Sequence, residues 1–142
     1  MQLLVNIDVP DIPTALAFYT HAFGLHEGRR LFAGTVVELL GASSPIYLLE
    51  KTQGSAPFAN SPQPRSYQRH WTPVHFDLVV DDLDAALARA LAAGACQQGP
   101  INTDVWGRSV GLSDPFGHGC CLLQWLGHGY DEVAEPSRPL KT

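Results

Sequence analysis

The chain has 142 residues, 45% hydrophobic and 16% charged, a composition typical of one soluble globular domain. Its net charge of −5, with only nine lysines and arginines, leaves no basic surface to displace the counterions of a nucleic acid, so we expect no nucleic-acid partner. The apolar stretches are shorter than the roughly 20 residues of a membrane span, and the N-terminus lacks a basic region, so we expect neither a membrane partner nor a signal peptide.

The first half of the chain predicts one helix among four strands. Residues 3–9 predict a strand that carries Asn6 and Asp8 on one face. Asp11 then provides a helix N-cap, apolar residues follow at helical spacing, and Gly24 ends the helix in the left-handed conformation that glycine favours. Three more strands are predicted around residues 30–33, 35–40 and 46–51.

The second half repeats this plan after an irregular, proline-rich connector over residues 52–72. Residues 73–80 predict a strand, Asp82 a helix N-cap and Gly94 a helix end. Short strands are then predicted near Cys96 and over residues 103–106, 109–113 and 120–126. The repeat is visible in the sequence itself, because residues 7–16 and 78–87 align at an offset of 71, half the chain length.

We therefore predict an α+β fold in which two βαβββ modules form a cupped, mostly antiparallel eight-stranded sheet with its helices outside. Module one is residues 1–51, the connector 52–72 and module two 73–126, together one domain over 1–126, and residues 127–142 are a C-terminal tail. A pseudo-two-fold axis between the modules places equivalent strand positions around one concave face, which is where we expect a ligand.

With these motifs the chain resembles the vicinal oxygen chelate superfamily, which includes glyoxalase I, extradiol dioxygenases, fosfomycin-modifying enzymes and bleomycin-resistance proteins. The resemblance rests on Asp11 to Tyr19 with Phe23-Gly24-Leu25 in the first half, and in the second on His75 to Ala86, Trp106-Gly107-Arg108 and Asp114 to His118. It supports the predicted fold and leaves the reaction open.

The resemblance also implies where a metal would bind. Members that are enzymes place ligands at four equivalent strand positions, which here hold Leu4, Tyr47, His75 and Cys121. Only His75 is a ligand of the usual kind, since leucine offers no donor atom and hard divalent ions prefer oxygen and imidazole. We therefore expect no metal cofactor. The alternative is a divalent-metal-dependent lyase or dioxygenase of the glyoxalase type that uses His75.

Pseudo-symmetry and strand alternation together indicate the residues of a ligand site. We expect side chains from equivalent strands to line one cavity, with Trp106 and Arg108 at its rim; the full set is Asn6, Asp8, Tyr47, His75, Asp77, Trp106, Arg108 and Cys121. No catalytic residue is identified, and His75 with Asp77 is the best candidate acid–base pair. The competing interpretation is that these polar groups only satisfy one another inside the fold.

Two functions from different classes follow. The first is a metal-free, bleomycin-resistance-like protein that binds an aromatic or cationic small molecule, a reading that fits antibiotic resistance. The second is the metal-dependent enzyme. Whether any reaction is catalysed stays open at this point. The odd number of cysteines, Cys96, Cys120 and Cys121, fits reduced thiols and a cytoplasmic location, and half-barrels of this size favour a homodimer.

Overall fold

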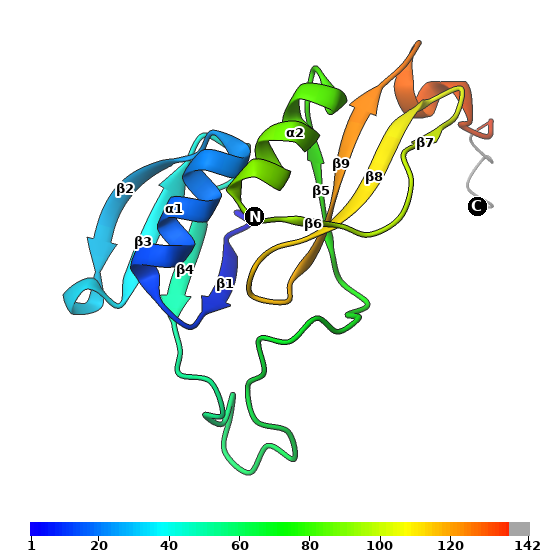
Figure 1. Cartoon of the computed structure of the whole chain (residues 1–142). Coiled ribbons are helices and arrows are strands. Elements are labelled where there is room, and N and C mark those ends of the chain that lie inside the picture. Colours follow the sequence, from blue (N-terminus) through cyan, green and yellow to red (C-terminus); the bar gives the residue numbers. More distant parts are fainter. Residues whose placement is uncertain (137–142) are drawn as a thin grey trace.

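The computed structural model describes residues 1–136 and contains two βαβββ modules that lie side by side (Figure 1). Module one consists of β1 (Val5–Val9), α1 (Ile12–Phe23), β2 (His26–Leu31), β3 (Val36–Leu40) and β4 (Ile46–Glu50). Its sheet has the order β1-β4-β3-β2, with β1 parallel to β4 and the other neighbours antiparallel. The α+β class and the two-module plan predicted from the sequence are confirmed.

Local chemistry sets the ends of both helices, as the sequence predicts. In α1 the Asp11 carboxylate accepts the Thr14 N–H at 2.9 Å, and Gly24 ends the helix at φ 68°. In α2 (Leu83–Ala93) Asp82 accepts the Ala85 N–H at 3.0 Å, and Gly94 ends the helix at φ 114°. Each helix buries its apolar face against its own sheet.

Module two repeats the order with one strand interrupted. It consists of β5 (Phe76–Val79), α2, the short strands β6 (Cys96–Gln97) and β7 (Asn102–Thr103), β8 (Gly107–Ser113) and β9 (Gly119–Trp125). The sheet order is β5-β9-β8-β6, and β7 pairs with the other end of β8. Gly99 at φ 105° and Pro100, which has no N–H to donate, separate β6 from β7.

The two modules form two sheets, not the single eight-stranded sheet that the sequence predicts. In the part of the chain that the structure describes, β1 pairs only with β4 and β5 only with β9, so no ladder joins the modules. Figure 1 shows α1 and α2 next to each other, and these helices pack together. The predicted strand over 30–33 also ends early, because Phe32 and Ala33 have positive φ angles and form a 3₁₀ turn, η1 (Phe32–Gly34).

The connector runs from one module to the other without a helix or a strand (Figure 1). The connector folds back on itself, since the Gly54 N–H donates to the Arg65 carbonyl at 2.9 Å and the Arg65 N–H to the Ser55 carbonyl at 2.8 Å. The predicted tail contains a 3₁₀ turn, η2 (Gly129–Glu132), and its residues 137–142 lie outside the described residues. Between residues 1 and 136 no helix has the length and apolar character needed to cross a membrane.

Candidate functional site

A cavity of about 1150 Å³ lies between the two modules. Its walls come from β1 and β5, from the connector and from the turn that precedes β9. Four of the eight predicted ligand residues line this cavity: Asn6, Asp8, His75 and Asp77. Because β1 and β5 are the equivalent first strands of the two modules, the internal repeat correctly indicates where these four residues gather.

Asp8 holds the connector in place. Its carboxylate accepts a hydrogen bond from the Arg65 Nε at 2.8 Å, and Arg65 also donates to the Ser55 hydroxyl and the Ala56 carbonyl. The Asp8 carbonyl lies 2.7 Å from the His118 Nε2, so the end of β1 contacts module two as well. Asp8 therefore shapes the cavity by fixing one of its walls.

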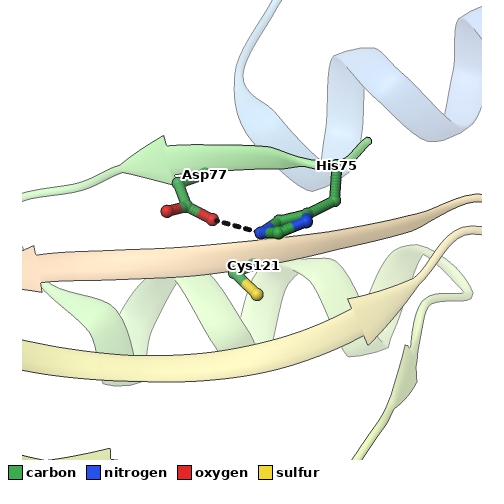
Figure 2. A group of neighbouring side chains, drawn as sticks. All are labelled: His75, Asp77 and Cys121. Carbon is green, nitrogen blue, oxygen red and sulfur yellow. Dashed lines mark ion pairs between the residues drawn. The ribbon is translucent and has the colours of Figure 1, made fainter. Parts of the chain in front are cut away.

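His75 and Asp77 approach Cys121 on the sheet face opposite α2. Figure 2 shows the three side chains, two from the β5 segment and one from β9. One ligand atom from each lies within 4.8 Å of the others, and the His75 Nε2 is 3.6 Å from the Asp77 Oδ1. Partial burial and the neighbouring Asp77 carboxylate raise the pKa of the Cys121 thiol, which is therefore protonated at neutral pH.

The four ligand positions implied by the resemblance do not form a set. Leu4 has no donor atom, and the Tyr47 hydroxyl donates to the Glu38 Oε2 at 3.0 Å. His75 and Cys121 do come together, and Asp77 supplies a third group. One imidazole, one carboxylate and one thiol fit a borderline ion such as Zn²⁺ better than a hard ion that prefers oxygen. His75, Asp77 and Cys121 thus fit a metal site with three protein ligands, all of them from module two.

Tyr47 belongs to an ion-pair network in module one. Glu38 on β3 is buried and receives the Arg29 guanidinium at 3.0 and 2.6 Å. The Arg29 hydrogen bonds are the main reason why the pKa of Glu38 falls to about 2. Tyr47 is not among the residues that line the cavity.

The two expected rim residues lie elsewhere. Arg108 donates to Asp84 on α2 at 2.7 and 3.2 Å, which places its side chain on the helix side of the sheet. Trp106 packs against Trp125 and Tyr130, with ring centroids 6.3 and 5.2 Å away, in an aromatic cluster at the end of β9. Neither residue lines the cavity, and Cys121 does not line it either.

The floor of the cavity is a buried hydrogen-bond hub. The Tyr19 hydroxyl donates to the Asp114 Oδ2 at 2.6 Å, and the Asp114 Oδ1 accepts the N–H groups of Phe116 and His118 at 2.9 and 2.8 Å. Beside it, burial and the Asp114 charge raise the pKa of the Cys120 thiol to about 12. The sequence predicts a turn here but gives no sign that its aspartate reaches the other module.

Gly117 in this turn and Gly119 at the start of β9 let the connector approach closely, a feature that the sequence does not predict. Gly117 has φ 87°, and a Cβ on it would lie 2.5 Å from the Gln68 carbonyl oxygen. A Cβ on Gly119 would lie 2.7 Å from an Arg69 guanidinium nitrogen. The two glycines in Gly117-His118-Gly119 indicate that another part of the chain could approach this segment closely. The irregular sequence of the connector does not indicate that Arg69 is the residue that does so.

Comparison with known proteins supports the same fold. Residues 4–123 match the family described as a glyoxalase-like domain. An enzyme of the glyoxalase/bleomycin resistance protein/dioxygenase family from Burkholderia phytofirmans is similar in structure, with a TM-score of 0.69, 21% identity, and coverage of 87% of this chain and 97% of that one. TnmS3, an antibiotic-binding protein from Streptomyces, has a TM-score of 0.63 and 26% identity, with 88% of this chain and 95% of TnmS3 covered.

One curated relative is the uncharacterized protein Mb0911c of Mycobacterium bovis, 46% identical over 54 residues. That match covers 37% of this chain and 36% of the relative, so it spans about a third of the length of the curated protein. The family match is much broader, since it takes in both modules and the cavity between them. The chain belongs to the glyoxalase-like domain family, within the vicinal oxygen chelate superfamily.

Proposed function

We propose that this protein binds an aromatic or cationic small molecule, without a metal ion, in the cavity between its two modules. The observation that carries the proposal is the cavity of about 1150 Å³ into which both β1 and β5 bring polar side chains. Small-molecule sites are concave, mostly apolar, and contain a few well-placed polar groups. This cavity has that character, with Asn6, His75 and Asp77 among apolar neighbours such as Val5 and Leu78.

The residues at the implied ligand positions favour a metal-free site. Leu4 and Tyr47 offer no free ligand atom, because leucine has none and the Tyr47 hydroxyl is engaged by Glu38. The similarity to TnmS3 also supports small-molecule binding, since TnmS3 is an antibiotic-binding protein. The guest class we propose is accordingly an antibiotic-like aromatic compound that the protein sequesters.

A thermal-shift screen of aromatic compounds in the presence of EDTA tests this proposal. A compound held at about 100 times its Kd stabilises the folded protein by about 2.7 kcal/mol, which raises Tm measurably. Asn6→Leu, which fills the wall and removes an amide, should weaken that shift, while Trp106→Phe, remote from the cavity, serves as the matched control. A screen in which compounds stabilise the protein only after metal is added would overturn the proposal.

A second candidate function rests on the cluster of His75, Asp77 and Cys121. These residues would hold a divalent ion, which when bound would supply Lewis-acid chemistry to a substrate oxygen. Elemental analysis of protein purified without chelator decides between the two functions. Near-stoichiometric metal that is lost in His75→Ala would favour the enzyme, and metal at trace level only would favour the binding protein.

We also propose a homodimer in a reducing, cytoplasmic setting. Within the described residues, β2 and β6 are the strands at the ends of the two sheets that lie away from the cavity, and such edge strands favour association with another chain. Free thiols at Cys96, Cys120 and Cys121 fit a reducing compartment. Sedimentation equilibrium that returns the monomer mass of 15.4 kDa at tens of micromolar would exclude the dimer.

A further inference from the structure

Arg69 is a cation in the cavity wall that lacks an acidic partner. Four other arginines pair with carboxylates: Arg29 with Glu38, Arg30 with Glu27, Arg65 with Asp8 and Arg108 with Asp84. Within residues 1–136, no carboxylate forms a salt bridge with Arg69. Its guanidinium therefore presents an uncompensated positive charge at the cavity.

The guanidinium of Arg69 is held in position by neutral groups. The Nε donates to the Gln98 side-chain oxygen at 3.1 Å, and a second nitrogen donates to the His70 carbonyl. The backbone of Gly119 lies directly against it, and any Cβ at position 119 would displace it. Arginine has five N–H donors in a fixed fork. Two are used here, and the other three have no partner in the described part of the chain.

Of the three carboxylates that line the cavity, two are engaged by other groups. Asp8 is bound by Arg65 at 2.8 Å, and Asp114 by the Tyr19 hydroxyl and two backbone N–H groups. Asp77 lies beside His75. The charge of Arg69 is also felt on the cavity floor, where it opposes the burial that raises the pKa of Cys120. A ligand anion thus meets the free donors of Arg69, while Asp8 and Asp114 are already engaged by other groups.

We propose that Arg69 anchors an oxyanion, and that the guest of this cavity is an aromatic acid whose carboxylate binds the Arg69 guanidinium. This inference rests on the proposed function and sharpens it, because it selects an acidic guest in place of a cationic one. Arginine binds carboxylates through two parallel hydrogen bonds, which would use the free donors of the fork. Gly119 and Gln98 are the positioning residues that hold the fork open to the cavity.

The test compares three probes of one shape and different charge: benzoate, uncharged benzamide and cationic benzamidine. Dissociation constants are measured by ligand-detected NMR on the full chain. Benzoate should bind about tenfold tighter than benzamide, the effect expected of a hydrogen bond between charged groups, and benzamidine should bind most weakly. Arg69→Gln should abolish the preference for benzoate by weakening benzoate binding more than it weakens benzamide binding.

Arg89→Gln is the matched control, because Arg89 is an exposed arginine on α2 outside this cavity. Arg69→Lys keeps the charge without the fork and should retain only part of the preference, and Gly119→Ala should reduce it by displacing the guanidinium. Unfolding curves confirm that each variant is folded. Benzenesulfonate and phenylphosphonate show which kind of oxyanion the site prefers. If either binds more tightly than benzoate, the preferred group is a sulfonate or a phosphonate, and Arg69 is still the residue that binds it.

The possible failures are distinguishable. If benzamide and benzamidine bind as tightly as benzoate, or Arg69→Gln keeps the preference, the oxyanion site is refuted and small-molecule binding stands. If none of the aromatic probes binds, including the uncharged one, both this inference and the proposed function fail.

Discussion

The hydroxyl of Tyr19 on α1 donates to the carboxylate of Asp114, which lies 95 residues further along the chain in the turn before β9. Both residues are buried, and the bond of 2.6 Å joins module one to module two. Burial and the Asp114 charge raise the pKa of the Tyr19 hydroxyl well above its usual value, so it keeps its proton and remains a donor at physiological pH. In the absence of a shared ladder, this bond is a specific link between the modules.

Replacing Tyr19 with phenylalanine should destabilise the protein by about 1–3 kcal/mol, because a buried carboxylate oxygen loses its donor while the ring is kept. Urea unfolding measures the difference. Tyr67→Phe is the matched control: its hydroxyl donates to the exposed Lys51 carbonyl, which water can satisfy, so the loss should be at most about 1 kcal/mol. Equal losses in the two variants would contradict the linking role of Tyr19.

Acid should weaken module one through Glu38. Its pKa in the folded protein is about 2, below the value of about 4.3 for glutamate in an unfolded chain. The contribution of the ionised carboxylate is therefore fully present above about pH 4.3 and is lost as the pH falls toward the folded pKa. Glu38→Gln removes this titration, so the Tm difference between wild type and variant should shrink on acidification. A difference that stays constant from neutral to acid pH would show that Glu38 has no such role.

The three cysteines should react in an order set by exposure and pKa. Cys96 is exposed, whereas burial raises the pKa of the Cys120 thiol to about 12 and partial burial raises that of Cys121. Because the thiolate is the reactive form, iodoacetamide at about pH 8 should alkylate Cys96 first and Cys120 last. Mass spectrometry of the modified peptides gives the order, and early alkylation of Cys120 would mean that the cavity floor opens in solution.

The last strand of each module also stabilises the start of its helix. The Glu50 carboxylate accepts the Ile12 N–H at 3.0 Å, and the Gln124 side-chain oxygen accepts the Leu83 N–H at 2.9 Å. Glu50→Ala and Gln124→Ala should each lower the free energy of unfolding by about 1 kcal/mol, as the loss of a helix cap does. Glu50→Gln should be nearly neutral, since module two already uses an amide there. Thermal unfolding measures all three, and a loss confined to one module would contradict the equivalence.

Features that depend on a few neighbouring residues could be predicted from the sequence. Asp11, Gly24, Asp82 and Gly94 end their helices as expected, because capping is decided within one turn of the chain. The separation of the two sheets could not be predicted, since it depends on how far β1 lies from β5 across the cavity. No local pattern records that distance.

Where the candidate site residues lie could also be predicted in part, and that they bind a ligand stays a prediction. Asn6 and His75 were found through the repeat, which carries three-dimensional information. Arg108 was misplaced although a signal existed: Val110 and Leu112 are buried, and alternation in β8 puts Arg108 on the same face, toward α2. Arg69 lies in a connector without periodicity, so only the folded chain shows its place.

The contact between α1 and α2 has a consequence for how binding could evolve. The faces that these helices bury include small residues such as Ala22 and Ala90. Because the modules share no ladder, this contact helps to set the angle between them, and a larger residue in it would change that angle and with it the shape of the cavity. Under the proposed function, the shape of the cavity is therefore adjustable from positions outside it, without loss of the residues proposed to bind.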